Sequence, residues 1–363
     1  MASWPRSSSP PGPTVPLPSD TPRRSAMSEE RHFLVTGANG FIGTRLVHEL
    51  IRRRGAGSIW ALMGPGSSGS TTAREFERLG VRILDADLMG SLPPRPEVPA
   101  FQTVFHLAAH AATEEVDGAF EINSEGTRRL LDWLGPSLRH ARIIHTGTLA
   151  SMDRKTRQGP ASESNSFESI TPYGQTKMEG EGWIQRLAPS LGYTFTIVRL
   201  CTVIGPGFRS GGMFAVFPKL LARGAWSTRL AWPGHASFLH VEDAARLLVE
   251  LAEAPAHAGQ IYLASNGEAI TFDHLLSGIA ARLNVPRGSI HPPAPFWDVL
   301  HRVSERASRM GWIPARARIF FWRVAKLCSD GLSVDSTKLH RAQPMQYRSV
   351  AQALDEIYGK PRF

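Results

Sequence analysis

A tyrosine and a lysine stand four residues apart in the segment TPYGQTK, residues 171–177. Four residues make about one helical turn, so the side chains of Tyr173 and Lys177 project from the same helix face. A free phenol ionises at about pH 10, too high for proton abstraction at neutral pH, but a neighbouring ammonium favours the phenolate. The pair therefore has the composition of a general acid/base. Because Tyr-x-x-x-Lys also arises by chance, its meaning depends on the sequence around it.

A glycine-rich turn stands at the start of the first apolar strand–helix unit. HFLVTG, from His32, is typical of a short buried strand, and it leads directly into TGANGFIG with glycines at 37, 40 and 43. Such glycines permit a tight turn, close approach of the backbone to a pyrophosphate and close packing of helix on strand. The phosphates then lie at the positive N-terminus of the helix expected over about residues 44–54. This context favours a dinucleotide site over a plain turn.

The second strand, SIWALM, is followed by GPGSSGS and not by an acidic residue. NAD sites normally place an acidic residue there to bind the adenosine ribose. Glycine and serine donors tolerate a 2′-phosphate, so this segment weakly favours NADP(H). Asp87 follows the third strand in LDADL, where its carboxylate could accept the adenine amino group; a solvated turn is the alternative.

Strands and helices alternate from His32 onward. Further strands are expected at TVFHLAA, ARIIHTG and YTFTIVRL, with helices at NSEGTRRLLDWLG and from about Tyr173. This alternation predicts an α/β fold, a Rossmann-type doubly wound parallel sheet covered on both faces. We expect an NAD(P)-binding domain over residues 32–204 and a smaller, mainly substrate-binding lobe over 205–363. Residues 236–265 are expected to return to the Rossmann core.

Composition also bears on the N-terminal tail and on membrane spans, disulfides and metal sites. Residues 1–31 are rich in Pro and Ser and have no apolar signal-peptide core, so we expect disorder and hypothesise that translation starts at Met27. No run approaches the ~18 apolar residues of a membrane span. Cys201 and Cys328 lie in apolar surroundings, which predicts buried thiols outside any disulfide and a reducing, cytoplasmic compartment. His106 and His110 lack the glutamate of a helical zinc motif, so we expect structural histidines and no metal site.

Eight motifs in order resemble the extended short-chain dehydrogenase/reductase family, including its NAD-dependent epimerase/dehydratase group. The likeness covers about residues 33–265. TGANGFIG resembles the family's cofactor loop, LDADL its adenine-side acid, VFHLAA its fourth-strand motif and NSEGT the helix motif that follows. IIHTGT resembles the strand that carries the catalytic hydroxyl, and TPYGQTK the catalytic helix. VRLCTVIGPG resembles the family's arginine and Gly-Pro-Gly stretch, and FLHVEDAARLL its His-Val-x-Asp motif.

The resemblance implies roles for individual residues. Tyr173 is expected to be the general acid/base, Lys177 its electrostatic partner and Thr148 the hydroxyl that orients the substrate oxygen; Thr146 competes for the last role. The implied NAD(P) contacts are Gly37, Asn39, Gly40, Phe41, Ile42, Gly43, Asp87, Leu88, Leu107, Ala108, Asn123, Tyr173 and Lys177. For Asn123 a helix N-cap is an equally good interpretation. The resemblance also leaves a homodimer open, because family members often dimerise through the helix that bears the Tyr and the Lys.

Departures from the family bear on the reaction. Sugar dehydratases of the family carry Asp-Glu after the catalytic hydroxyl, whereas Leu149 and Ala150 stand here, which disfavours dehydration. Many nucleotide-sugar epimerases place Arg-Asp where this chain has Ala236 and Ser237, and their Arg-Pro-Gly-Asp element is missing. A diphosphate needs cations, Arg above all. The basic residues that could substitute are Arg209, Lys219, Arg223 and Arg229.

A basic segment follows in the second half. Nine Lys or Arg lie between Arg282 and Lys326, against only Asp298 and Glu305. Aromatic residues alternate with the arginines over about 296–327. One interpretation is that the apolar residues form the core of the substrate-binding lobe and the basic residues its solvated rim. Another is that the segment contacts a membrane surface peripherally or admits a lipid substrate, so that the cytoplasmic protein is also membrane-associated. Nucleic acid is not expected as a partner, because no nucleic-acid motif is present.

We therefore expect an NAD(P)-dependent oxidoreductase that interconverts a secondary alcohol and a ketone on a small-molecule substrate of apolar, sterol-like or lipid-like character. The alternative is a nucleotide-sugar 4-epimerase or 4-ketoreductase that uses the same Thr148, Tyr173 and Lys177. A third hypothesis is a cofactor-sensing protein without catalysis, since a fold alone does not define a function.

Overall fold

The computed structural model describes residues 31–90, 92, 98–111, 120–152, 159–165, 169, 171–208 and 212–361. Residues 31–363 form one unit of the chain. Residues 1–30 are not described, so the predicted disorder of the tail and the proposed start at Met27 lie outside the described residues. The candidate cation Arg209 also lies outside them.

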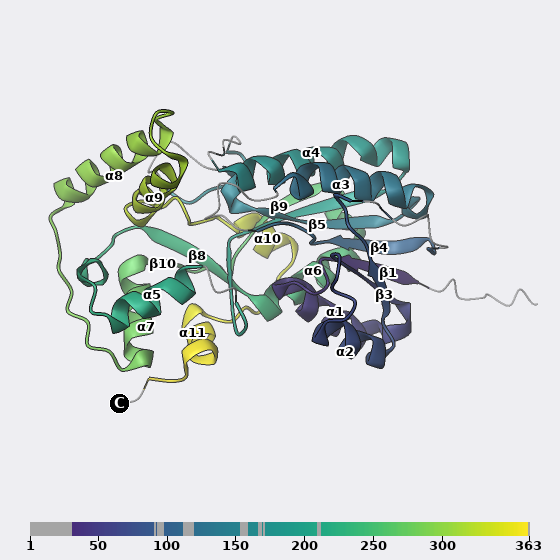
Figure 1. The fold of residues 1–363 in the computed structure, drawn as a ribbon, viewed down its shortest axis with the longest axis horizontal. Coiled ribbons are helices and arrows are strands. Elements are labelled where there is room, and N and C mark those ends of the chain that lie inside the picture. The colour runs from purple at the N-terminus through teal and green to yellow at the C-terminus, as the bar shows by residue number, and fades with distance from the viewer. Residues whose placement is uncertain are drawn as a thin grey trace, which may run out of the picture. The chain divides into compact units, whose positions relative to one another are not determined.

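Seven strands form a sheet in the order β3-β2-β1-β4-β5-β6-β9, and every neighbouring pair is parallel (Figure 1). The strands are β1 (His32–Thr36), β2 (Ile59–Met63), β3 (Arg82–Asp85), β4 (Phe101–His106), β5 (Arg142–Thr148), β6 (Thr194–Leu200) and β9 (Gln260–Ala264). The strand order reverses between β1 and β4. Open α/β sheets bind ligands at the carboxyl ends of the strands at such a switch point.

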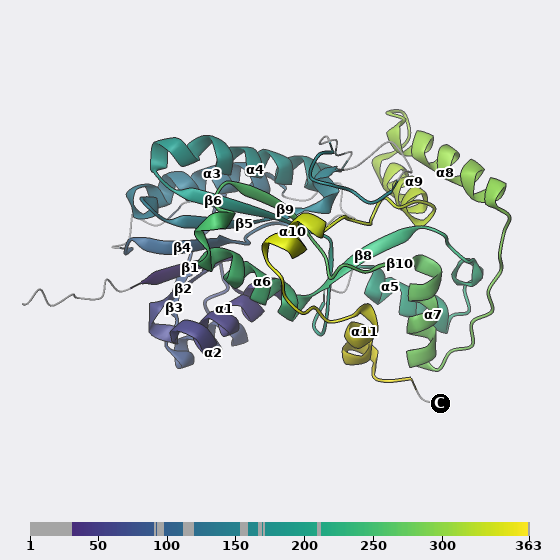
Figure 2. The ribbon, with the colours of Figure 1, turned by 180° about the vertical axis from the view of Figure 1, so that it is seen from behind.

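Helices cover both faces of this sheet (Figures 1 and 2). On one side lie α1 (Phe41–Arg54), α2 (Thr71–Leu79) and α6 (Val241–Glu253), and on the other α3 (Glu121–Leu134) and α4 (Pro172–Leu191). Successive strand residues point to opposite faces. Val35 accordingly packs in the cluster with Leu247 of α6, and Leu34 in the cluster with Leu130 of α3 and Ile184 of α4. The predicted doubly wound α/β fold is confirmed.

A smaller sheet and the later helices form the rest of the unit. Its strand order is β10-β8-β7, with β7 (Thr202–Ile204), β8 (His235–His240) and β10 (Ala269–Thr271). The helices are α5 (Met213–Ala222), α7 (Phe272–Leu283), α8 (Ala294–Arg309), α9 (Ala315–Leu327), α10 (Thr337–Ala342) and α11 (Val350–Tyr358). Short 3₁₀ turns are η1 (Ala56–Ser58), η2 (Gly135–Leu138), η3 (Leu149–Met152), η4 (Trp226–Arg229) and η5 (Pro255–His257).

The predicted return of residues 236–265 to the main sheet needs a correction. β9 does join that sheet, parallel to β6. β8 does not, because it pairs with β10 on one side and β7 on the other. The chain therefore crosses from the smaller sheet to the main sheet through α6.

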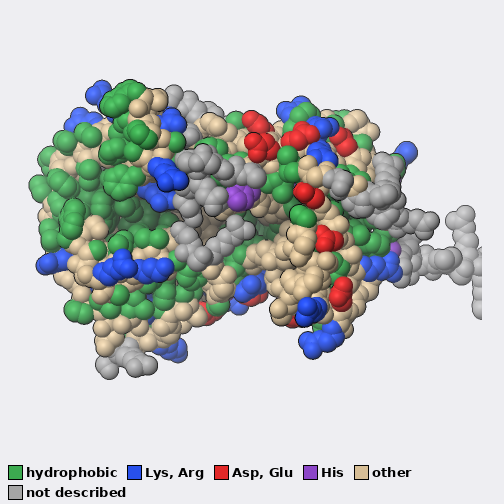
Figure 3. Space-filling model, viewed as in Figure 1, with side chains coloured by type: hydrophobic (Ala, Val, Ile, Leu, Met, Phe, Trp, Pro, Cys, Tyr) green, Lys and Arg blue, Asp and Glu red, His purple; other side chains and the backbone are tan. Residues whose placement is uncertain are grey.

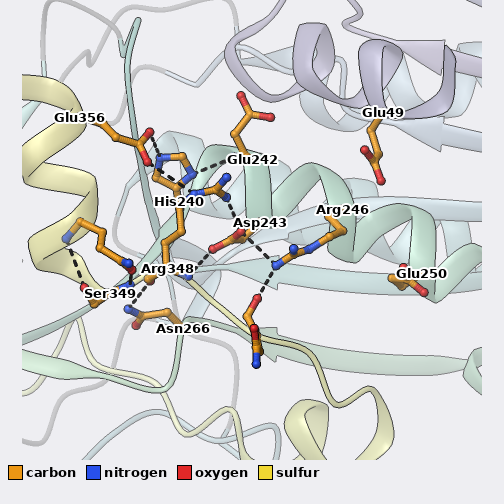
Figure 4. A network of polar contacts seen from close by, with 12 residues as sticks. Glu49, His240, Glu242, Asp243, Arg246, Glu250, Asn266, Arg348, Ser349 and Glu356 are labelled. Atoms are coloured by element: carbon orange, nitrogen blue, oxygen red, sulfur yellow. Dashed lines mark hydrogen bonds and ion pairs between the residues drawn. The ribbon is translucent and has the colours of Figure 1, made fainter. Parts of the chain in front are cut away.

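The His-Val-x-Asp motif ties α6 to the C-terminal segment (Figure 4). The ring of His240 accepts a hydrogen bond from the amide of Glu242 at the start of α6, and its Nε2 lies 3.0 Å from a carboxylate oxygen of Glu356 on α11. Asp243, fully buried, accepts from both the amide and the guanidinium of Arg348, each at 2.6 Å. The motif thus has a structural function, because buried charges require partners.

Two further expectations concern the described residues. Cys201 and Cys328 are both buried and form no disulfide, as predicted. Among the described helices, none is both long enough and apolar enough to cross a bilayer.

Candidate active site

The glycine loop after β1 forms a cradle that side chains would fill. Gly37 has φ +67°, and a Cβ there would lie 2.8 Å from the amide nitrogen of Ala108. On the first turn of α1, a Cβ on Gly43 would lie 2.1 Å from the carbonyl oxygen of Gly37. No side chain caps the helix at Gly40, and its first turn has no acidic residue. The amides and the helix dipole are therefore available to a pyrophosphate, and the loop fits NAD(P).

The predicted contacts at this loop divide into exposed and buried groups. Asn39 is exposed, and its amide donates to the hydroxyl of Ser67 at 2.9 Å, which joins the glycine loop to the turn after β2. Phe41 and Ile42 are half-buried at the start of α1. Leu107 and Ala108 follow β4 across the switch point, and both their amides donate to the hydroxyl of Thr36.

The carboxylate of Asp87, beyond β3, is half-buried and accepts from the amide of Met89 at 2.9 Å. This bond fixes the turn and leaves the carboxylate with further lone pairs for an adenine amino group. Leu88, by contrast, is only 3% exposed and packs in the core beneath α3. Its side chain therefore supports the turn from below.

A buried hydrogen-bond chain runs beneath the cradle. Nδ1 of His106 lies 2.8 Å from the hydroxyl of Thr36, and Nε2 lies 2.9 Å from that of Thr127. Thr36 already accepts from two amides, and Thr127 donates to the carbonyl of Asn123. The consistent assignment has Thr36 donating to Nδ1 and Nε2–H donating to Thr127. Burial, and secondarily the charge of Lys177, lowers the pKa of His106 to about 3, so the ring is neutral.

Asn123 joins the exit of β4 to α4, the helix that carries Tyr173 and Lys177. The residue is 1% exposed. The side-chain oxygen Oδ1 accepts a hydrogen bond from the backbone amide of His110. The side-chain nitrogen Nδ2 donates to the backbone carbonyl of His110 and to the hydroxyl of Thr176. The N-cap interpretation is wrong, because α3 starts at Glu121 with Phe120 as N-cap. Asn123 therefore acts as a clamp at the residue directly before Lys177.

The sequence TPYG explains where α4 starts. The hydroxyl of Thr171 accepts from the amide of Gly174, a standard N-cap, and Pro172 occupies the first helical position. Tyr173 follows in the first turn, half-buried, and Lys177 lies one turn further. A Cβ on Gly174 would lie 2.3 Å from the carbonyl oxygen of Ala150, so only glycine allows this approach. The helix start is thereby pressed against the turn that follows Thr148.

The two candidate hydroxyls of β5 differ in accessibility. Thr148, at the carboxyl end of the strand, is half-buried, and its hydroxyl accepts from the amide of Ala150 at 3.2 Å. Thr146 is 7% exposed, and its hydroxyl donates to the carbonyl of His106 on the neighbouring strand. The geometry therefore favours Thr148 as the hydroxyl that a substrate could reach.

Lys177 is buried beside an ion pair that sequence reasoning did not single out. It is 2% exposed, and burial lowers the pKa of its ammonium to about 8, while Glu181 one turn along acts in the opposite direction. Glu181 itself is held by Arg199 of β6 at 2.8 Å, with both side chains buried. A Cβ on Gly147 would lie 2.3 Å from a carboxylate oxygen of Glu181, so the pair fits only beneath a glycine. The available signal was the Lys-x-x-x-Glu spacing on one helix face.

Within the described residues no group of three or more His, Cys, Asp or Glu could hold a metal ion. His106 and His145 lie opposite each other on β4 and β5, with ring centroids 5.0 Å apart. Burial, together with the charge of Lys177, also lowers the pKa of His145 well below its usual value. Two neutral, buried histidines are thus part of the floor of the site.

Comparison with known proteins agrees with this arrangement. The chain is 28% identical over 299 residues to a UDP-glucose 4-epimerase of Mycolicibacterium smegmatis, covering 77% of this chain and 93% of that protein. It is 27% identical over 292 residues to 3beta-hydroxysteroid-dehydrogenase/decarboxylase isoform 2 of Arabidopsis thaliana, covering 74% of this chain but only 51% of that protein.

The fold also matches solved structures. MoeE5 in complex with UDP-glucuronic acid and NAD superposes with a TM-score of 0.66 at 20% identity, covering 90% of this chain and 97% of that one. The profile of the NAD-dependent epimerase/dehydratase family matches residues 33–264, which include the glycine loop, β5 and α4. The chain therefore belongs to the NAD-dependent epimerase/dehydratase family of extended short-chain dehydrogenase/reductases, enzymes that act with NAD(P).

Proposed function

We propose that this enzyme interconverts a secondary alcohol and a ketone by net hydride transfer on an apolar, sterol-like or lipid-like substrate. The observation that supports the proposal is the close packing of the helix start at Gly174 against Ala150, two residues after Thr148. The start of α4 packs against the turn after β5, and Lys177 follows Tyr173 by one turn. When bound, NAD(P) supplies the hydride acceptor or donor.

Each of the three side chains has a distinct role in this proposal. In the oxidative direction, the phenolate of Tyr173 takes the hydroxyl proton while the carbinol hydrogen leaves as hydride; in reduction both return. The ammonium of Lys177 favours the phenolate. Its lowered pKa of about 8 still leaves it mostly charged at neutral pH. The hydroxyl of Thr148 binds the substrate oxygen and holds it against the phenol.

The apolar substrate class is supported by side chains of the smaller sheet and α5. Ala236 and Ser237 are buried in β8 and pair with β10, so this strand offers no cation to a diphosphate. Phe208, Met213 and Phe217 are partly buried apolar residues around the start of α5. Similarity to a hydroxysteroid dehydrogenase/decarboxylase agrees with this class.

Cofactor choice forms a finer part of the proposal: NADP(H) is preferred over NAD(H). The turn after β2 has glycines and serines and no acid to repel a 2′-phosphate. Gly64 offers a test, because a Cβ there would meet no atom within 4 Å. Gly64→Asp should weaken NADPH binding and spare NADH. Much tighter binding of NADH than NADPH by the original chain would contradict the preference.

The alternative activity is nucleotide-sugar 4-epimerisation or 4-ketoreduction. Its support is the similarity to UDP-glucose 4-epimerase and the exposed cations Lys219, Arg223 and Arg229. Arg287 is not available to a diphosphate in the same way, because its guanidinium is bound to Asp273 at 2.6 Å and to the carbonyls of Thr228 and Leu230.

One experiment separates the two activities. The full chain is incubated with NADPH or NADH and a panel of apolar ketones, including 3-ketosteroids, and separately with UDP-glucose and UDP-galactose. The proposal expects stoichiometric NAD(P)H oxidation with a ketone of the panel, slowed about 10²–10⁴-fold in Tyr173→Phe. Interconversion of the UDP-sugars without net cofactor turnover would reject it in favour of the alternative.

A further inference from the structure

We propose that the helical hairpin formed by α8 and α9 docks onto an anionic lipid bilayer. This inference goes beyond the proposed function and does not depend on it, because none of the residues assigned to the candidate active site lies in the hairpin. The hairpin also lies beyond residue 264, where the family match ends.

The inner face of the hairpin is already anchored in the protein. Trp297 is 5% exposed and its ring centroid lies 5.2 Å from that of Trp232. On α9, Trp322 and Ala325 are buried, and Cys328 directly after the helix joins the same core as Trp297. These buried residues form the apolar stripe by which a surface helix normally packs against the protein core.

A second apolar stripe faces outward. The outer face consists of the exposed residues Phe296, Val299, Val303, Met310, Trp312 and Phe320. Val303 is 56% exposed, Phe320 59% and Trp312, in the turn between the helices, 81%. On α8 the first three follow one another at i, i+3 and i+7, so they line one side of the helix. Large apolar side chains that gather in one exposed region mark an interaction surface.

Positive charge accompanies this outer face. Residues 294–327 contain seven Lys or Arg and two acidic residues. Glu305 is paired with Arg309 at 2.7 Å, and the side chains of Arg302, Arg306 and Arg316 are exposed to solvent. Figure 3 shows hydrophobic side chains over the region of α8 and α9 at the upper left, with Lys and Arg at its borders. Aromatic residues combined with arginine on an amphipathic helix suit the interface of an anionic bilayer.

Charge also argues against a second copy of this chain as the occupant. A two-fold contact would place the same patch on both partners, arginines against arginines. Anionic headgroups, in contrast, complement the arginines, while the apolar side chains enter the acyl boundary to a depth of about 5–10 Å. Trp312 at the tip of the hairpin is the residue type enriched at that depth. The docking is peripheral, with both helices in the plane of the interface.

Vesicle co-sedimentation of the full chain tests the proposal. Vesicles of phosphatidylcholine with phosphatidylserine, roughly seven to three, are compared with phosphatidylcholine alone at low and high salt. We expect binding to the anionic vesicles, weakened by salt. Arg302→Glu with Arg306→Glu should reduce binding at least tenfold, since each basic residue contributes about fivefold. Val303→Ser with Phe320→Ser should reduce it comparably through lost apolar insertion.

Matched controls lie on the Rossmann side. Arg78 and Leu79 at the end of α2 are exposed, so Arg78→Glu and Leu79→Ser should leave vesicle binding unchanged. Brominated lipids should quench the tryptophan emission of the original chain more than that of Trp312→Phe. The proposal is overturned if the chain stays in the supernatant, or if the hairpin variants bind as the controls do. It is equally overturned if sedimentation velocity shows a dimer that the hairpin variants abolish.

Discussion

The candidate active site of the Rossmann core and the outer face of the α8–α9 hairpin follow opposite physical rules. In the core, two buried polar side chains have defined partners: His106 lies between two hydroxyls, and Glu181 is paired with Arg199. On the hairpin, large apolar side chains and arginines face solvent. Proton and hydride transfer require fixed geometry, which burial and close packing provide. Binding to a bilayer, in contrast, requires apolar and charged side chains that are still exposed to solvent.

The largest expected effect is on catalysis in the core. Tyr173→Phe removes the hydroxyl that we propose transfers the proton, so kcat should fall about 10²–10⁴-fold. The protein should still bind NAD(P)H, because the glycine cradle is unchanged; fluorescence titration measures this. Tyr193→Phe is a matched control, since the hydroxyl of Tyr193 bonds to the carbonyl of Ile184. Near-normal turnover of Tyr173→Phe would refute the assigned role.

A stability measurement contrasts the two regions directly. Glu181→Gln leaves Arg199 charged and buried without its counter-ion, so the free energy of unfolding should fall by about 3–5 kcal/mol. Arg306→Gln on the hairpin should change it by less than about 0.5 kcal/mol, as for most surface substitutions. Urea unfolding gives both values. Glu179→Gln is the control, because Glu179 is exposed on the same helix as Glu181. An equal loss of stability in this control would contradict the prediction that burial of the Glu181–Arg199 pair causes the loss.

The buried Lys177 should affect how the free energy of unfolding changes with pH in the alkaline range. The pKa of Lys177 is lowered from 10.5 to about 8 in the folded protein. Between these values the unfolded chain binds more protons, so the free energy of unfolding should rise with pH, by up to about 3 kcal/mol. Lys177→Met should flatten this rise, whereas Lys338→Met, at an exposed lysine, should not. An unchanged slope in Lys177→Met would show that the charge is accommodated without cost.

A smaller effect is expected on the acid side. Burial lowers the pKa of His106 from 6.5 to about 3, so the unfolded state gains protons first as pH falls below about 6.5. Stability should therefore decrease by about 2 kcal/mol between pH 6.5 and about pH 5. His106→Asn should reduce this pH dependence even if it lowers absolute stability. His48→Asn, at an exposed position of α1, should retain it; identical slopes for the two variants would contradict the assignment.

Local signals predicted most of the main sheet and the helix that carries the candidate site residues Tyr173 and Lys177. Alternating apolar strands and amphipathic helices indicated the doubly wound fold, and the expected helix from about Tyr173 agrees with α4, which starts at Pro172. The pairing of β8 was not predictable in the same way. Its apolar run resembles a core strand, and only its neighbours β10 and β7 place it in the smaller sheet.

The sequence by itself determined the glycine loop, the one-turn spacing of Tyr173 and Lys177 and the amphipathic, basic character of residues 296–327. All three depend on residues close together along the chain. The tertiary structure decided that Thr148 is more accessible than Thr146, that Asn123 is a clamp and that Lys177 is buried beside an ion pair. Those properties depend on partners 13 to 53 positions apart, brought together only by packing. Burial then sets the charge of each group, because the cost of a charge depends on what surrounds it.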